Sequence, residues 1–216
     1  SFSYNKNDRD KNLSYYASAY FKHLFSNPKK ELTFDMNYYH LQASNSIRFS
    51  ENNSIVSQIS NSEPYQNSWN ARVNYCTALG ENLKLETGTK QSLTILADND
   101  YLSFSYKQMV SAAYALSTYT KQKFQINGGA RIEYASYKVN KDLNKTFISV
   151  LPGINAKYDL SNKDNLKFAY QKQIVRPNIY QLNPNRSAID PYTTQKGNSY
   201  LKPIIRHTLA LNYSAT

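Results

Sequence analysis

The segment from Arg176 to Pro203 reads RPNIYQLNPNRSAIDPYTTQKGNSYLKP and contains four of the seven prolines of the chain. An alternating segment enters it from Leu166 to Val175, and another leaves it from Ile204 to Tyr213. Proline fixes φ and extends the residue before it, and Asn-Pro, Asp-Pro and Gly-Asn steps favour turns. A strand connection of this length is either functional or disordered. Its many conformational restraints favour an ordered, functional loop.

Alternation of apolar and polar residues with a period of two dominates the rest of the chain. The pattern predicts an all-β fold, an antiparallel up-and-down meander of about nine or ten long strands. These strands are expected at about residues 13–25, 31–41, 67–79, 83–92, 103–119, 123–135, 146–159, 165–176 and 204–214. Pro152 and Gly153 predict a bulge or bend within one of them.

The connections between these strands alternate in length. Short turns are expected at 26–30, 80–82, 120–122 and 160–164, and long connections at 42–66, 93–103, 136–145 and 176–203. In an up-and-down barrel, alternate connections lie at the same end, so the long ones form one rim. Together with strands of about 10 to 16 residues, this sorting is typical of a transmembrane outer-membrane β-barrel and not of a Greek-key sandwich. The 42–66 connection has room for a small hairpin that turns near Asn52.

The composition allows such a barrel. The mean hydropathy is −0.67, and the absence of any run of about 18 apolar residues excludes an α-helical membrane protein. A membrane barrel has low mean hydropathy because its lipid-facing residues alternate with water-facing ones. Five tyrosines on apolar parities are expected at the headgroup level near strand ends: Tyr15, Tyr38, Tyr106, Tyr134 and Tyr158.

The net charge of +11 comes from 26 Lys and Arg residues that are spread thinly along the chain. No basic cluster stands out, so no nucleic-acid partner is expected. Catalysis and cofactors are not expected either. His23, His40 and His207 fall on separate strands without metal-ligand spacing, and Cys76 is the only cysteine. The six glycines include no phosphate-binding motif.

Several fixed spacings in the second half of the chain resemble the late-barrel signature of TonB-dependent receptors of the Bacteroidetes type. The residues that carry it are Arg176, Pro177, Leu182, Asn183, Pro184, Asp190, Pro191, Tyr192, Gly197, Asn198, Leu201 and Pro203. Upstream, residues 127–134 resemble the G-x-R-x-E strand of that family, and residues 147–153 resemble its F-P strand start. Ser199 and Ile204 depart from the signature, which usually has proline and glutamate there. The match covers about residues 83–216, and residues 1–82 fit by pattern only.

The resemblance implies part of a receptor that binds a nutrient outside the cell and imports it through a gated barrel in the Gram-negative outer membrane. Such receptors are barrels of about 22 strands with a plugged lumen. The chain holds about nine or ten strands and no plug, so it is expected to be a piece of the middle-to-late barrel. The implied partners are outer-membrane lipid, the remaining barrel and plug, the TonB complex, and a small-molecule, glycan or peptide nutrient.

Charged residues on the polar parities are expected to face the lumen, namely Arg72, Lys84, Glu86, Arg131 and Glu133. The signature residues are expected mainly to hold the shape of the 176–203 loop, and the less patterned 42–66 connection to contact the ligand. Two alternatives remain open. One is a soluble or surface-exposed β-barrel or sandwich that binds a ligand without transport. The other is an outer-membrane enzyme or adhesin on a small closed barrel.

Overall fold

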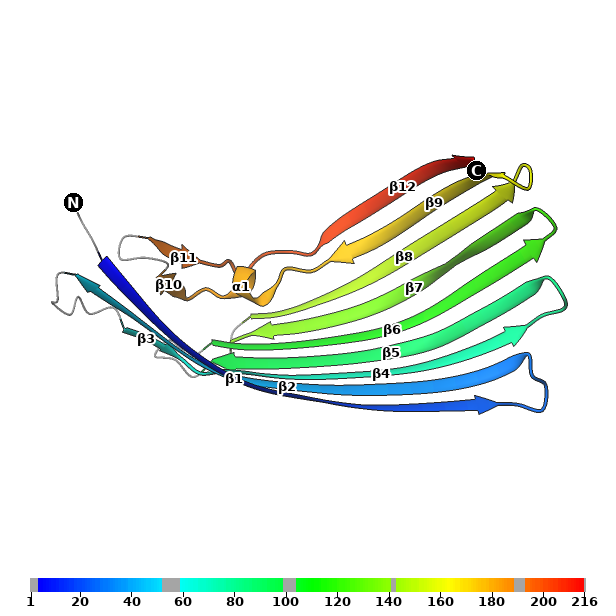
Figure 1. Ribbon diagram of the computed structural model, residues 1–216. Helices are drawn as coiled ribbons and strands as arrows, with labels where there is room; N and C mark the ends of the chain where they lie inside the picture. Colours follow the sequence, from blue (N-terminus) through cyan, green and yellow to red (C-terminus); the bar gives the residue numbers. More distant parts are fainter. Residues whose placement is uncertain (1–3, 52–58, 99–103, 141–142, 189–192, 216) are drawn as a thin grey trace.

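The computed structural model describes residues 4–51, 59–98, 104–140, 143–188 and 193–215. Its main sheet is an antiparallel meander in the order β1-β2-β4-β5-β6-β7-β8-β9-β12 (Figure 1), which confirms the predicted all-β fold. These strands are β1 (Tyr4–Leu24), β2 (Lys30–Glu51), β4 (Pro64–Ala78), β5 (Leu83–Asp98), β6 (Phe104–Lys121), β7 (Phe124–Val139), β8 (Leu143–Asp159), β9 (Asp164–Val175) and β12 (Ile204–Ala215).

The smaller elements lie at one end of the sheet. β3 (Ile59–Ser62) pairs with β2 beyond the end of β4. The predicted loop between β9 and β12 contains α1 (Ile179–Leu182), β10 (Arg186–Ala188) and β11 (Thr194–Lys196), and the last two form a separate two-stranded sheet. Figure 1 shows this loop at the end opposite the short turns. Within the part of the chain that the structure describes, no helix is long and apolar enough to span a membrane.

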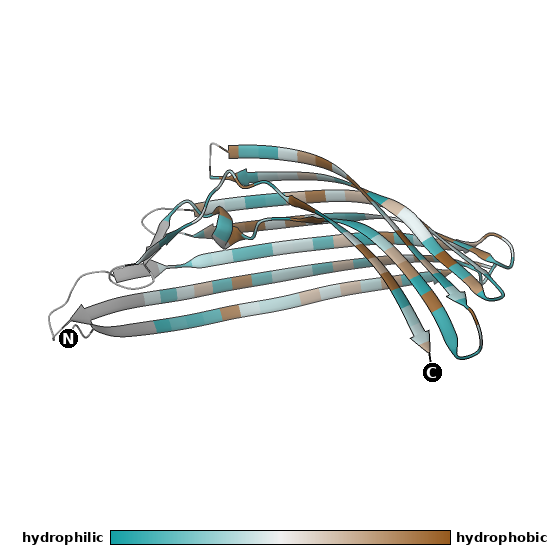
Figure 2. Cartoon of the chain, turned by 90° about the horizontal axis from the view of Figure 1, so that it is seen from above, coloured by the Kyte–Doolittle hydropathy of each residue, from teal (hydrophilic) through white to brown (hydrophobic). Residues whose placement is uncertain are grey.

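The strands are staggered relative to one another. A row of directly paired residues starts at Glu31 in β2 and ends at Gln171 in β9 after crossing each strand between them. Glu31 is one residue from the first residue of β2, whereas Gln171 is seven residues from the first residue of β9, Asp164. Such stagger tilts the strands and lets a sheet close into a barrel. Figure 2 shows the strands arching in this way.

Towards the rim with α1, the strands run further than the sequence predicts. β2 continues to Glu51, β5 to Asp98 and β7 to Val139, and β8 begins at Leu143. The expected long loops at 42–66, 93–103 and 136–145 are therefore wrong in extent, since the connections after β5 and β7 cover only 99–103 and 140–142. In these stretches the apolar residues change face, which ends the pattern without ending the strand. The hairpin turn expected near Asn52 lies outside the described residues.

Of the bulge or bend expected at Pro152, the bulge is wrong. β8 pairs with β7 in an unbroken register through Pro152 and Gly153. On its other side, β8 pairs with β9 only from Gly153 to Asp159. Pro152 is therefore the first residue beyond that ladder, where a missing N–H matters least. The proline marks the point at which β9 and β12 diverge from β8.

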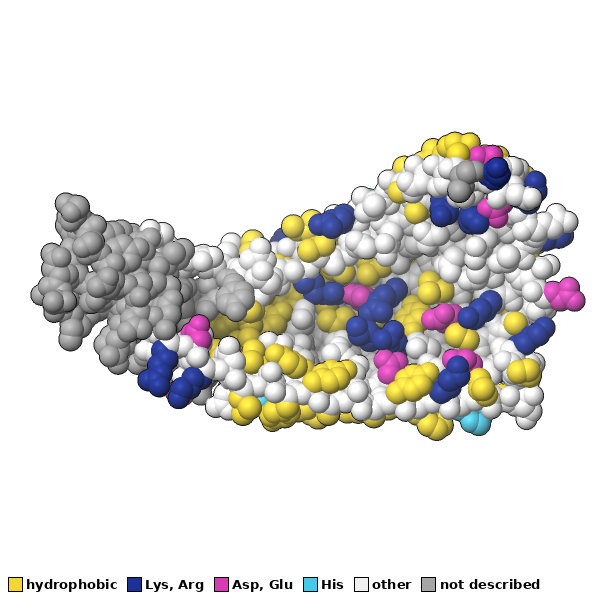
Figure 3. Space-filling view, viewed as in Figure 1, with side chains coloured by type: hydrophobic (Ala, Val, Ile, Leu, Met, Phe, Trp, Pro, Cys, Tyr) yellow, Lys and Arg dark blue, Asp and Glu magenta, His cyan; other side chains and the backbone are white. Residues whose placement is uncertain are grey.

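The two faces of the sheet differ in chemistry. The convex face exposes apolar side chains along the strands, such as Phe21, Val73, Ile132, Val150 and Leu209. The concave face carries most of the charged side chains of the strands (Figure 3). This split is the pattern of a barrel wall with lipid on one side and water on the other.

Most of the expected aromatic positions lie on the convex face. Tyr15, Tyr134 and Tyr158 are 51%, 41% and 46% exposed there, and Tyr38 packs on Trp69 with 4.1 Å between ring centroids. Tyr106, however, is only 7% exposed and belongs to the concave face, so its expected place at the lipid surface is wrong. β6 has apolar residues on both parities, and the middle of its convex side, from Ser111 to Ser117, is formed by small residues. Periodicity alone therefore could not assign its faces.

Candidate functional site on the concave face

Charged side chains gather in a hollow of about 790 Å³ at the middle of the concave face. Arg72, Glu86, Arg131 and Glu133 line it from β4, β5 and β7, and Arg176 lines it from the end of β9. Strand alternation brings the first four to one face, and cross-strand pairing brings them close together. Figure 3 shows basic and acidic side chains side by side in this hollow.

Glu133 is the centre of the tightest ionic contact. Its Oε1 accepts a hydrogen bond from Nε of Arg131 at 2.6 Å, and its Oε2 accepts one from the Arg176 guanidinium. The Glu133 side chain is 7% exposed, and the two arginine side chains are 29% and 21% exposed. One nearly buried carboxylate thus holds two cations, and one of them is the first residue of the signature loop.

A second part of the wall lies on β2, β4 and β5. Arg72 forms an ion pair with Asp35 across β2 and β4, with 3.2 Å between Nη2 and Oδ1. Lys90 stands directly opposite Arg72 on β5. Like charges at directly opposed positions repel. Because Asp35 already offsets the charge of Arg72, Lys90 adds a further positive charge to this side of the hollow.

Tyr114 crosses this part of the wall. It pairs with Gly88 in β5, and its hydroxyl donates to the Asn74 side chain in β4. An ideal Cβ built on Gly88 would lie 2.6 Å from the Val73 carbonyl oxygen and 2.5 Å from the Tyr114 hydroxyl. The ring thus lies where only glycine leaves space. One aromatic side chain in this way joins three strands.

The concave face becomes apolar nearer the rim with α1. Phe104 and Tyr106 from β6 and Tyr137 and Val139 from β7 form a buried cluster with Leu182 of α1, which is 1% exposed. Leu96, Leu143, Phe147, Ile179 and Leu201 pack around it. The loop between β9 and β12 therefore folds inward onto the wall.

Hydrogen bonds inside the loop fix its shape. Asn178 caps α1, since its Oδ1 accepts from the Gln181 N–H at 2.9 Å and the Gln181 side chain accepts from the Asn178 N–H at 2.9 Å. The N–H of Gly197 donates to the Asn183 carbonyl at 2.8 Å, and the N–H of Asn198 donates to the Gln181 carbonyl at 2.7 Å. The exit of the loop is thereby tied to its entry.

The structure brings together Arg72, Glu86, Arg131 and Glu133 of the predicted lumen-facing set. Lys84 lies on the same parity of β5 but outside the lining of the hollow, nearer the short turns. Of the predicted signature residues, Asp190, Pro191 and Tyr192 lie outside the described residues. In the described part of the chain, no three His, Cys, Asp or Glu side chains are grouped so that they could hold a metal ion.

Sequence reasoning missed the contact between Arg176 and Glu133 and the apolar cluster. A signal for the cluster existed. Tyr137 and Val139 share the parity of Glu133, so an apolar pair stands on the polar face just past the predicted strand end. No local signal marks the ion pair, because its partners are 43 positions apart.

A staggered antiparallel sheet with an exposed apolar convex face and a charged concave face is the wall of a membrane β-barrel. The chain belongs to the Outer membrane protein beta-barrel family, whose model matches residues 23–216. It is thus an outer-membrane protein, as predicted.

Solved structures of outer-membrane receptors share the fold. The ferric-catecholate import receptor Fiu from Escherichia coli K12 superposes with a TM-score of 0.73 and 12% identity, over 95% of this chain and 38% of Fiu. The alcaligin receptor FauA from Bordetella pertussis gives 0.63 and 13%, over 99% and 35%. FpvA from Pseudomonas aeruginosa, bound to a heterologous pyoverdine, gives 0.65 and 12%, over 93% and 30%.

This chain thus spans little more than a third of the length of these receptors at most. At such identities the likeness concerns the fold alone. Among curated proteins the sequence has no match.

Proposed function

We propose that the chain forms part of the barrel wall of a TonB-dependent receptor of the Bacteroidetes type, which binds a nutrient outside the cell and imports it through a gated barrel. The observation that carries the proposal is the concave face, where a charged wall is covered at one end by an ordered, inward-folded loop. Nutrient import through a wide barrel needs both a hydrated polar wall and a structured outer end. The relatives described as import receptors have the same fold.

In this proposal the concave face is the lumen. Arg72, Lys84, Glu86, Arg131 and Glu133 then face water or the plug. The partners are the remaining barrel, the plug, the TonB complex, outer-membrane lipid and a small-molecule, glycan or peptide nutrient. The two free edges of the sheet, β1 and β12, pair with the remaining strands of the barrel, since unpaired strand edges are not stable in lipid.

The signature residues have a mainly structural role in this proposal. Arg176 attaches the loop to the wall, Leu182 anchors it in the apolar cluster, and Asn183, Gly197 and Asn198 close it on itself. These groups are already engaged and have little capacity left for a ligand. Contacts specific to the nutrient are assigned to the rim around the connection between β2 and β4.

Energy-dependent uptake tests the proposal. Cells that make the full-length receptor are compared with cells that lack it on panels of ferric chelates, glycans and peptides as limiting nutrients. We expect one class to need the receptor, and its uptake, but not its surface binding, to stop when the TonB complex is deleted. Receptor-dependent uptake that continues without the TonB complex would show that the proposal is wrong.

A further inference from the structure

Two lysines oppose each other on the convex face near the rim with α1. Lys107 of β6 and Lys138 of β7 are directly paired residues, and both side chains are exposed. Among the described residues, their paired and flanking neighbours on this face are uncharged: Ile95, Ser105, Met109, Ser136, Asn140 and Asn144. Like charges at directly opposed positions are destabilising. An anion from outside the chain would remove this repulsion.

The height of the pair follows from the apolar belt below it. On β7 the belt runs from Phe124 to Tyr134, a rise of ten residue steps, which spans about 25 Å for a strand tilted about 40°. That equals the usual thickness of the apolar band of an outer-membrane barrel. Lys138 is four residues beyond Tyr134, about 10 Å higher along the membrane normal. It therefore lies at the level of lipid headgroups, at the rim with the longer connections, which is the extracellular one.

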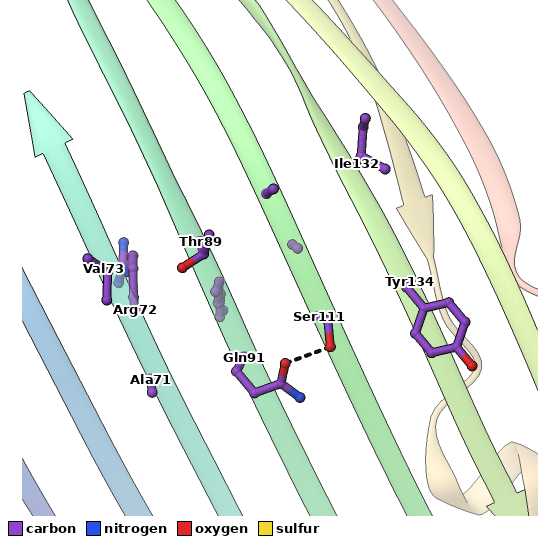
Figure 4. A pocket seen from close by; sticks show the side chains of 11 residues that line it. Ala71, Arg72, Val73, Thr89, Gln91, Ser111, Ile132 and Tyr134 are labelled. Atoms are coloured by element: carbon purple, nitrogen blue, oxygen red, sulfur yellow. Dashed lines mark hydrogen bonds between the residues drawn. The ribbon is translucent and has the colours of Figure 1, made fainter.

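An apolar groove of about 600 Å³ lies on the same strands directly below the lysines. Small residues on this face line it, namely Ala71, Thr89, Ser111 and Ala113, together with the larger Val73, Gln91, Ile132 and Tyr134. Arg72 and Lys90 also belong to its lining. Figure 4 shows Val73 on one side of the groove and Ile132 and Tyr134 on the other. Two of its polar side chains pair with each other, since the Ser111 hydroxyl donates to the Gln91 side chain at 2.6 Å. Ser111 is four residues from Lys107 and Tyr134 is four residues from Lys138, about 13 Å along each strand.

We propose that this surface is a binding site for one phosphorylated lipid of the outer leaflet. Lys107 and Lys138 bind its phosphate, and one of its acyl chains lies in the groove between Val73 and Tyr134. The phosphate removes the repulsion between the two lysines, and the small lining residues let a chain pack close to the sheet. The lysine pair alone would not distinguish a lipid from free phosphate, and the groove alone would not distinguish a bound lipid from bulk hydrocarbon. Their vertical order, cations at headgroup level above an apolar groove, does so.

The test measures lipid retained by the full-length receptor. Wild type and variants are purified from outer membranes in mild detergent, and bound lipid A is quantified by native mass spectrometry at equal amounts of folded receptor. The variants are K107Q, K138Q, the double variant, and A113L, which fills the groove. K121Q is the matched control, since Lys121 is the last residue of β6 at the opposite rim.

We expect each lysine substitution to lower retained lipid A about fivefold and the double variant about 25-fold. A113L is expected to lower it about threefold through lost packing while both lysines remain. K121Q should leave it unchanged. Excess inorganic phosphate should not displace the lipid, because phosphate cannot occupy the groove.

Retention in the double variant equal to that of wild type would overturn the proposal. Displacement of the lipid by inorganic phosphate, or an A113L variant that behaves like wild type, would overturn it as well, since each would reduce the site to an unspecific anion contact.

Discussion

The two ends of the same strands reverse their faces. We call the half of the sheet nearer the short turns the lower part and the half nearer α1 the upper part. In the lower part of β7, Ile132 and Tyr134 are exposed on the convex face, and Glu133 is nearly buried on the concave face. A few residues further on, Lys138 is exposed on the convex face, and Tyr137 is buried on the concave one. Neither the strand nor its register changes between them. Only the surroundings change.

This reversal shows what alternation reports. In the lower part the convex face meets lipid and the concave face meets water, so apolar residues point outward. Beyond the membrane the convex face meets water, and the concave face is covered by the loop that carries Leu182. A period of two identifies a strand, but the side on which its apolar residues lie depends on which solvent is there.

The junction of the two parts is Glu133, and its substitution is expected to have the largest effect. Glu133→Gln removes the carboxylate that holds Arg131 and Arg176, and leaves two poorly exposed guanidinium groups without an anion. Removal of one partner from a buried ion pair costs about 3–5 kcal/mol. We expect a loss of that size in the free energy of unfolding of the protein, measured by urea titration in detergent.

Glu86→Gln is the matched control for that experiment. Glu86 lines the same hollow, and the structure records no ion pair for it in the part of the chain that it describes. We expect a change below about 0.5 kcal/mol, as for ordinary surface substitutions. Equal effects of the two substitutions would contradict the assignment of Glu133 as the junction.

Truncation of Leu182 tests the upper part alone. Leu182→Ala empties a fully buried position in the apolar cluster, at a cost of about 2–5 kcal/mol. We expect the cost to appear as undocking of the loop, because the lower wall does not depend on the cluster. The measurement is the rate of proteolytic cleavage within residues 177–203 of the folded protein, which should rise by at least about tenfold.

Leu79→Ala serves as its control, since Leu79 is 53% exposed and lies in a short turn at the other rim. Its cleavage rate should match that of wild type. A loop that stays equally protected in Leu182→Ala would show that the cluster does not hold it.

Much of the lower part could be predicted from the sequence, because lipid imposes a strict pattern on it. Strands such as β2 and β7 reveal their faces through residues like Phe34 and Ile132. The upper part could not be read in this way. Tyr106 and Val139 lie on the face that is polar lower down, so the pattern appeared to end where only its surroundings changed. The contact of Arg176 with Glu133 depends on the curvature of the sheet, which no local pattern encodes.

An arginine placed at two heights on one face sharpens the boundary between the parts. Ile154 and Thr146 lie on the same strand and parity of β8, with Ile154 in the middle of the apolar belt. Arginine on the lipid face costs about 2–4 kcal/mol at the bilayer midplane and about 0–1 near the interface. We therefore expect Ile154→Arg to make folding into lipid vesicles less favourable by the larger amount, and Thr146→Arg by the smaller amount. Equal costs would mean that the belt has been placed at the wrong height.

The smallest effect is expected inside the lower wall, at Gly88. A Cβ there would lie 2.6 Å from the Val73 carbonyl oxygen, a backbone atom that cannot move without disturbing the pairing of β4 and β5. Tyr114 would also have to leave Asn74. We expect Gly88→Ala to cost about 1–3 kcal/mol in urea titration of the protein.

Gly153→Ala is the control, because its Cβ would meet nothing nearer than 3.7 Å. Gly153 lies on the same concave face, so a shared loss of backbone freedom cancels between the two. If both variants unfold alike, the ring of Tyr114 does not join the strands of the lower wall. A larger cost at Gly88 alone would show that this wall is held by packing across strands, as the upper part is held by its loop.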